Sequence, residues 1–250
     1  MKKIKFSREL SYFAGILLLA IGAAMMSKGG YGMSMVVAPA YIIYQKLSAY
    51  SSIITFGLAE YIVQGILLIV LIIVVRRFKI TFIGAFITTF IYGLILDLFM
   101  YLMSLFALDV IALKIIFYII GELLCAMGIA FIFQTYLIPE VYDLFVKEVS
   151  KKFNFSFSKT KIVYDIVSLV VAISLSFILF GFGNFVGVGI GTVIIAFING
   201  PLIGLFTKLY LKIFEFDDAF HKLKRFLKDV DEKAVEKEDM KEQENNENDN

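Results

Sequence analysis

The stretch from Ser52 to Val75, SIITFGLAEYIVQGILLIVLIIVV, decides the fold class. Its only charged side chain is Glu60, and about 20 apolar helical residues are enough to cross a hydrocarbon core of about 30 Å. Lipid tolerates no unpaired backbone, so such a segment must be helical. Five more segments meet the same requirement: Leu10 to Met26, Thr81 to Phe106, Ile111 to Leu137, Lys161 to Gly181 and Ile190 to Phe214. The sequence therefore predicts an all-α membrane protein with six transmembrane helices.

The composition of the chain agrees with this class and excludes several others. Of 250 residues, 60% are apolar and 18% are charged, which exceeds what the surface of a soluble domain tolerates. One Cys and one His, Cys125 and His221, exclude a disulfide framework and a zinc site built from several such ligands. No nucleotide-binding ending follows the glycine-rich turn, and no catalytic motif identifies a reaction. We expect no enzyme, no cofactor and no binding to nucleic acid.

Two shorter segments lie between the predicted spans. Met33 to Leu47 is apolar but contains Pro39, so we expect a short helix that is either re-entrant or spanning. Pro139 to Phe153 carries six charged residues among apolar residues at three-to-four spacing. This pattern is typical of an amphipathic helix that lies in the membrane interface.

The second half of the chain repeats the first at a nearly constant offset. Tyr12, Gly15 and Gly22 align with Tyr118, Gly121 and Gly128, and a second set of identities joins the segments 84–99 and 191–206. The pattern predicts two repeats, 1–107 and 108–214, each with three spans. Under the alternative reading, these glycines are only small faces that let helices approach.

An odd number of spans in each unit inverts the second unit relative to the first. Loop charges test this independently, because short cytoplasmic loops are enriched in Lys and Arg. With the N-terminus inside, the basic clusters at 2–8, 76–79 and 147–161 all fall on the inner side, and only Lys28, Lys46 and Lys114 remain outside. We expect two inverted three-helix repeats with both termini in the cytoplasm.

Three motifs carry a family resemblance: Ser27-Lys-Gly-Gly-Tyr-Gly-Met-Ser34, Tyr92-Gly-Leu-Ile-Leu-Asp97, and Asn199-Gly-Pro-Leu-Ile-Gly-Leu-Phe206. Over roughly residues 8–214 the chain resembles the YczE/YyaS/YitT family of bacterial membrane proteins. The resemblance implies a multi-pass protein of the bacterial plasma membrane and supports the architecture above. Members of that family are often regarded as candidate transporters, but the resemblance implies no particular solute.

Three acidic residues lie inside the predicted spans, where an ionisable group costs about 2.5 to 3.5 kcal/mol to insert. Glu60 and Glu122 each lie about nine or ten residues from the outer end of their spans, so at about 1.5 Å per residue they can share a depth. Asp97 lies in the outer third of its span. We expect these acids to bind a solute or exchange a proton. The alternative is that each is protonated or hydrogen-bonded as a structural contact between helices.

Two further features are candidate parts of a solute site. The turn with Gly30 and Gly32 precedes Ser34, a predicted N-cap, and a helix start with free N–H groups attracts anions. Asn199, beside Gly200 and Pro201, marks a helix that we expect to be broken, and broken helices expose backbone groups to a cavity. A plain chain reversal and a structural amide are the alternatives.

The last segment, 215–250, changes in character. It holds 7 Lys/Arg against 13 Asp/Glu, a net charge of −6, whereas residues 1–214 hold 17 against 9, a net charge of +8. We expect an amphipathic helix on the inner leaflet, followed by a disordered acidic tail.

Two functions from different classes fit this sequence. The first is a secondary carrier of a small solute, with an anion among the candidates. The second is a scaffold, assembly factor or substrate-capture subunit that works with a partner protein. Beyond the lipid bilayer, the sequence specifies no solute, coupling ion, partner protein or oligomeric state.

Overall fold

The computed structural model describes residues 3–51, 53–221 and 225, and in these residues the protein forms eight helices and two short strands. The helices are α1 (Arg8–Gly29), α2 (Ala38–Leu47), α3 (Phe56–Val75), α4 (Ile80–Ser104), α5 (Ile111–Ile132), α6 (Val141–Lys152), α7 (Phe157–Phe180) and α8 (Ile190–Ile213); the strands are β1 (Ile4–Ser7) and β2 (Phe214–Asp217). All helices except α2 and α6 are long and apolar enough to cross a membrane. The prediction of a multi-pass membrane protein with six helical spans is confirmed.

The helices end where local hydrogen bonding dictates. α3 begins at Phe56 and not at Ser52, because the Thr55 hydroxyl accepts a hydrogen bond from the Leu58 N–H at 3.1 Å and so caps the helix. α5 ends at Ile132, five residues before the predicted end. Outward-facing apolar side chains such as Ile66, Ile69 and Ile73 on α3 are exposed, as expected of a surface that contacts lipid.

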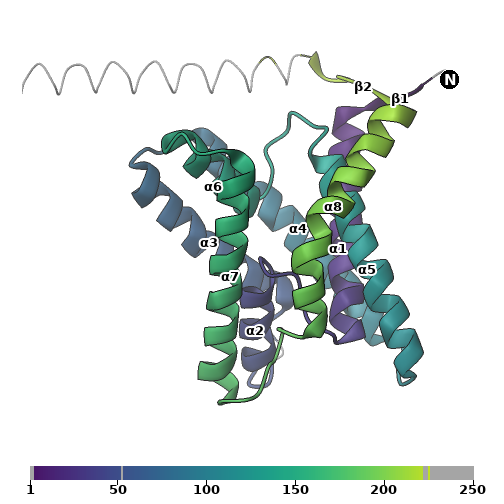
Figure 1. Ribbon diagram of the computed structural model, residues 1–250, viewed down its shortest axis with the longest axis vertical. Helices are drawn as coiled ribbons and strands as arrows, with labels where there is room; N and C mark the ends of the chain where they lie inside the picture. Colours follow the sequence, from purple (N-terminus) through teal and green to yellow (C-terminus); the bar gives the residue numbers. More distant parts are fainter. Residues whose placement is uncertain (1–2, 52, 222–224, 226–250) are drawn as a thin grey trace, which may run out of the picture.

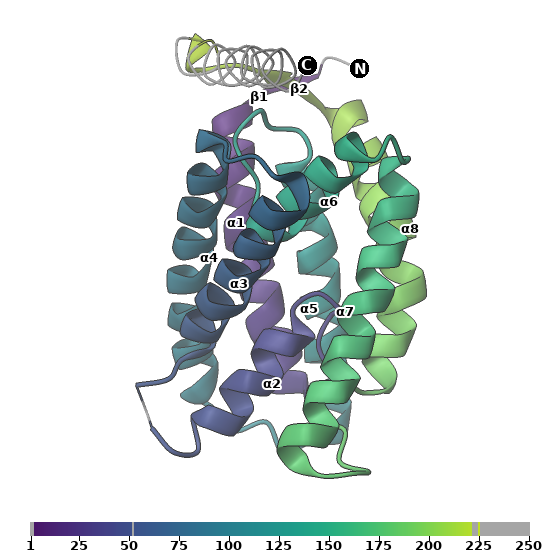
Figure 2. The same ribbon diagram turned by 90° about the vertical axis from the view of Figure 1, so that its left-hand side faces the viewer.

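α1 and α5 lie side by side and pack against each other along most of their length (Figures 1 and 2). They run antiparallel and touch through their glycines, with Gly15 opposite Gly128 and Gly22 opposite Gly121. A Cβ atom on Gly15 would lie 2.8 Å from the Gly128 carbonyl oxygen, and one on Gly128 would lie 2.7 Å from the Gly15 carbonyl oxygen. Only glycine allows two backbones to approach so closely.

The short helices α2 and α6 lie toward opposite ends of the bundle (Figure 2). α2 packs against α3 and α7, and α6 packs against α3, α4 and α7. One side of α6 packs inside the bundle, since Val141 and Val146 are fully buried and Glu148 is 7% exposed, whereas Lys147 and Lys151 are exposed. The position of α6 in the membrane interface stays a prediction.

The basic loops lie at one end of the molecule. Lys79, just before α4, forms an ion pair of 2.6 Å with Glu148 of α6, and the Lys152 ammonium donates to the Val75 carbonyl oxygen at 3.0 Å. Figure 1 places β1 and β2 at this same end. The grouping of the 76–79 and 147–161 clusters that the loop charges predicted is therefore present in the structure.

The chain after α8 forms a clamp with the start of α1. β1 and β2 pair in parallel, with Ile4 opposite Phe214 and Ser7 opposite Asp217. The Glu9 carboxylate accepts hydrogen bonds from the N–H groups of Ala219 (3.1 Å) and Phe220 (2.9 Å).

The prediction that an amphipathic helix follows α8 directly is wrong, because residues 214–217 are a strand. Phe216 of that strand lies edge-on to Phe6 of β1, a contact that the pairing of the two strands creates. The predicted disordered tail and most of the predicted amphipathic helix lie outside the described residues.

Candidate functional site

Two buried carboxyl groups share one amide in the middle of the bundle. Gln64 follows Glu60 by one turn of α3, and its amide nitrogen donates to Glu60 Oε2 and to Glu140 Oε2, both at 3.1 Å. Glu60 and Gln64 are fully buried and Glu140 is 6% exposed. The two carboxyl groups are thus held close together by a single side chain.

Two hydroxyl groups fix this arrangement. Thr89 of α4 donates to Gln64 Oε1 at 2.6 Å, which sets the orientation of the amide, and Tyr142 of α6 donates to Glu60 Oε2 at 2.9 Å. The network therefore ties α3, α4 and α6 together. Burial, and then the neighbouring Glu60 carboxyl, raise the pKa of Glu140 well above its ordinary value, because both effects disfavour a second negative charge.

A cavity of about 80 Å³, the central cavity, adjoins the network and reaches to α5 and α8. Glu122, Glu140, Tyr92 and Asn199 contribute polar groups to its wall. Both carboxyl oxygens of Glu122, the Tyr92 hydroxyl, Glu140 Oε1 and Asn199 Oδ1 are buried without a hydrogen-bond partner. Such groups are uncommon in proteins and call for an explanation, because each costs free energy when left unpaired.

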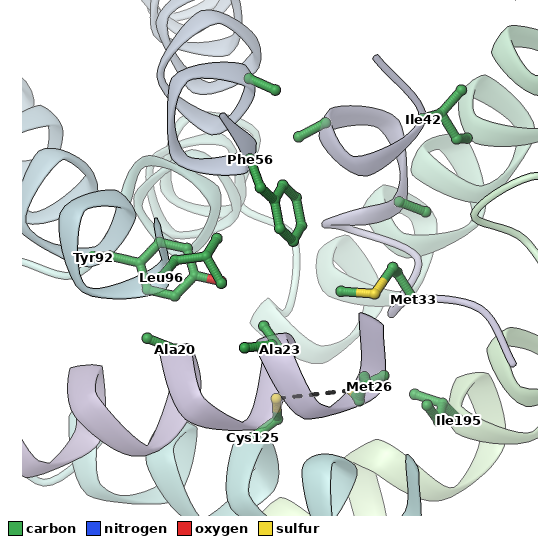
Figure 3. Close-up of a cluster of buried hydrophobic side chains, with 14 of the residues drawn as sticks. Ala20, Ala23, Met26, Met33, Ile42, Phe56, Tyr92, Leu96, Cys125 and Ile195 are labelled. Atoms are coloured by element: carbon green, nitrogen blue, oxygen red, sulfur yellow. Dashed lines mark hydrogen bonds between the residues drawn. The ribbon is translucent and has the colours of Figure 1, made fainter. Parts of the chain in front are cut away.

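Much of the remaining wall of the cavity is apolar, and Ser34, Tyr142, Asp143 and Lys161 add further polar groups. Figure 3 shows Tyr92 extending from α4 into the buried cluster, and Ala23 and Met26 of α1 and Met33 line the same cavity farther along. Cys125 of α5 faces the same space, and its sulfur lies 3.9 Å from the Met26 sulfur. The unpartnered oxygens of Glu122, Tyr92 and Asn199 therefore lie beside apolar side chains. Low local polarity strengthens their interaction with any charge that enters the cavity.

The predicted site residues fall into different parts of the molecule. Glu122, Ser34 and Asn199 line the central cavity, whereas Glu60 lies beside it in the hydrogen-bonded network. Asp97 lines a separate cavity of about 490 Å³ between α1, α2, α3 and α4. There, Asp97 Oδ1 accepts a 2.7 Å hydrogen bond from the Gly57 N–H in the first turn of α3. The three acids do not line one cavity.

Part of the backbone of the glycine-rich turn is hydrogen-bonded within the protein, and its role as an anion site stays a prediction. Gly30 has a φ of 77° and ends α1 by donating to the Met26 carbonyl oxygen, and Gly32 and Gly30 line a third cavity. The turn pairs with the second glycine-rich loop: Met33 donates to the Gly187 carbonyl oxygen at 3.0 Å, and Gly191 donates to the Tyr31 carbonyl oxygen at 3.1 Å. The N–H groups of Gly30 and Met33 are thus already used within the protein.

Two local predictions about these segments are wrong. Ser34 does not cap α2 with its side chain. The helix begins at Ala38 after an N-cap at Val37, and it is the Ser34 carbonyl oxygen that accepts from Val37 and Ala38. The helix that contains Asn199 is not broken either, because α8 runs from Ile190 to Ile213 with Pro201 inside it. The proline removes one backbone hydrogen bond without ending the helix.

The site also contains four residues that no sequence pattern indicated: Glu140, Thr89, Tyr142 and Tyr92. Glu140 was counted among the charges of an interfacial helix, although it follows Pro139 directly. Gln64 was available as a signal, because an amide one helical turn after a buried acid is a natural partner for it.

A comparison with protein-family models finds a match over residues 6–208 to a family of unknown function, DUF6198. No curated protein and no solved structure matches the chain. The resemblance to the YczE/YyaS/YitT family is therefore not confirmed by any named relative.

Proposed function

We propose that this chain, which belongs to the DUF6198 family of unknown function, is a secondary carrier that binds a small solute in the central cavity. The observation that carries this proposal is Glu122, a 6% exposed carboxyl whose two oxygens have no hydrogen-bond partner. It lies in a cavity between segments from both halves of the chain. An intramembrane carboxyl of this kind is costly and is typically retained for a function.

The contacts between α1 and α5 support two inverted repeats. With the offset that aligns Gly15 with Gly121 and Gly22 with Gly128, the observed pairs Gly15–Gly128 and Gly22–Gly121 are reciprocal. Reciprocal contacts are typical of a two-fold axis, here one lying in the membrane plane. The short helices extend this relation, since α2 packs on α7 and α6 packs on α3. Inverted repeats with a central site are typical of secondary transporters.

The arrangement of cavities supports access from the end opposite the basic loops. Ser27, Tyr41 and Gln45 line both the 490 Å³ cavity beside Asp97 and the cavity beside Gly32. Met26 and Met33 line both the latter cavity and the central one. The three cavities thus lie in series, and Tyr41 stands between the first two, with Gln45 donating to its hydroxyl oxygen at 2.7 Å. We place the basic end in the cytoplasm of a bacterium, as the positive-inside rule predicts.

The test is a transport assay in reconstituted vesicles that contain a pH-sensitive dye. A panel of small cationic, neutral and anionic solutes is added with and without an imposed proton gradient. We expect solute-dependent proton movement that falls at least about tenfold in Glu122→Gln, the scale of loss for a group that takes part in proton transfer. Glu215→Gln is the matched control, because Glu215 is exposed on β2 and lines none of the three cavities. Wild-type flux from Glu122→Gln would remove Glu122 from the mechanism.

One observation favours the alternative of a subunit that works with a partner protein. In the most apolar stretch of α7 and of α8, 17% of the residues are buried inside the protein, against 50% in α1 and in α5. Lipid or a partner can cover these faces. Co-purification of one stoichiometric partner from native membranes, together with no flux from the isolated protein, would favour this second function.

A further inference from the structure

The polar groups of the central cavity have a common chemistry. Every unpartnered polar atom named for its wall is an oxygen: two from Glu122, one each from Glu140, Tyr92 and Asn199. Carboxylate and amide oxygens accept hydrogen bonds and do not donate them. Oxygen ligands of this kind are what hard cations such as Na⁺ and K⁺ and the N–H groups of ammonium ions bind.

The one cationic side chain on the cavity wall is already engaged. Lys161 of α7 forms a 2.9 Å ion pair with Asp165 and lies 5.6 Å from the centre of the Tyr164 ring. Asp143 of α6 also lies within electrostatic range of Lys161. Neither Glu122 oxygen receives a hydrogen bond from Lys161 or from any other group. The Glu122 carboxyl therefore has no counter-charge from Lys161, the cationic side chain on the cavity wall.

We propose that the central cavity binds a small monovalent cation, and that the cation and a proton compete for the Glu122 carboxyl. This inference names the solute class of the carrier proposed above and rests on that function for its role in transport. With the cavity empty, a buried carboxyl without a partner holds its proton. When the cation enters, the proton leaves, and the total charge of the cavity is unchanged because one positive charge replaces another.

The volume and the ligand set limit the cation. A cavity of about 80 Å³ has room for a cation the size of one or a few water molecules, such as Na⁺, K⁺, ammonium or methylammonium. Glu122 offers one negative charge, and Tyr92 and Asn199 add neutral oxygens to the same wall, so these ligands suit a single positive charge.

Several titratable groups surround Glu122 and belong to the same equilibrium. Its own helix contributes Tyr118 and Cys125, both within electrostatic range, whereas Met26 of α1 and Asn199 of α8 do not titrate. The other titratable side chains on the cavity wall are Tyr92 of α4, Glu140, Tyr142 and Asp143 at α6, and Lys161 of α7. Glu122 differs from Glu140 in having neither oxygen hydrogen-bonded, because Glu140 Oε2 accepts from Gln64.

The experiment measures binding without transport. The purified full-length protein in detergent is heated at pH 8.0 in NaCl, KCl, ammonium chloride or methylammonium chloride, with choline chloride at equal ionic strength as the reference. We expect at least one small cation to raise the unfolding midpoint, saturably, by about 2–4 °C, and the rise to shrink at pH 5.5 as protons compete. The response identifies whether a metal ion or an ammonium compound is the source of the charge.

Two variants separate the proposal from a general salt effect. Glu122→Gln should abolish the response, and Glu215→Gln, which changes an exposed carboxyl on β2, should keep it. If Glu122→Gln does not fold, Tyr92→Phe, which removes one cavity oxygen at constant shape, should weaken the response at least about tenfold in cation concentration. A response equal to that of choline, or one unchanged in these cavity variants, overturns the inference. Transport of neutral solutes without cation binding would contradict the cation site and leave the carrier function supported. Cation binding without any flux would support the cation site and contradict the carrier function.

Discussion

At the scale of single residues, burial alone does not separate structural from functional acids. Asp97 has an intramembrane position, yet its carboxylate accepts from the Gly57 N–H in the first turn of α3, where a negative charge also complements the helix dipole. The sequence shows that Asp97 lies in a span, but not that the start of another helix packs against it. Tertiary packing supplies that information.

A pH-dependent prediction concerns Glu140, which lies outside the spanning helices. Its pKa is raised in the folded protein above the value of about 4.3 that an unfolded Glu has. Its contribution to stability is therefore full below that value and is lost as the pH rises through the folded pKa. In thermal unfolding in detergent between pH 4 and pH 9, we expect the midpoint of the wild type to fall with rising pH more steeply than that of Glu140→Gln.

The control for this measurement is Glu215→Gln, because Glu215 is exposed on β2 and its removal should leave the wild-type slope intact. Parallel slopes for the wild type and Glu140→Gln would show that Glu140 titrates as it does in the unfolded chain.

At the scale of elements, the positions and most ends of the six long helices could be predicted, because each is a long apolar run that lipid forces into a helix. The contacts of α6 could not be predicted. Its mixture of charged and apolar residues indicates an amphipathic helix, but not which helices cover its apolar side or that Glu148 pairs with Lys79. The continuity of α8 through Pro201 was also missed, because a membrane helix tolerates a proline when its neighbours absorb the distortion.

The glycine contacts between α1 and α5 give a prediction at this scale. A Cβ atom on Gly22 would lie 2.5 Å from the Gly121 carbonyl oxygen, so Gly22→Val must push α1 and α5 apart. We expect a loss of about 1–3 kcal/mol in the free energy of unfolding, measured by denaturant unfolding in mixed micelles.

Gly204→Ala in α8 is the matched control. A Cβ atom there meets nothing within 4 Å, and alanine is a better helix former than glycine by about 1 kcal/mol. This variant should be as stable as the wild type or more stable. Equal loss in both variants would mean that glycine content, and not the α1–α5 contact, sets the stability.

At the scale of the whole molecule, the placement of the basic loops predicts the labelling of single cysteines. In a Cys125→Ala background, Phe78→Cys and Lys151→Cys lie at the basic end, whereas Asp109→Cys and Phe182→Cys lie in the loops at the opposite end. All four positions are exposed. We expect a membrane-impermeant thiol reagent added to intact cells to modify the second pair and to spare the first until the cells are opened.

Modification of Phe78→Cys and Lys151→Cys from different faces would break the topology and, with it, the inverted relation of the two halves. The sequence supplied this level of organisation through loop charges alone. It did not supply the central cavity, because the cavity wall combines side chains from six helices and the loops between them, and no local pattern reports how these meet.

The clamp of β1 and β2 has a consequence for biosynthesis. The ribosome makes residues 4–7 before the six long apolar helices and their partners 214–217 after them. Throughout membrane insertion the first strand has an unsatisfied edge, and Glu9 has none of the amides that it later binds. The pairing of β1 with β2 and the hydrogen bonds to Glu9 can therefore form only after the six long helices have been synthesised.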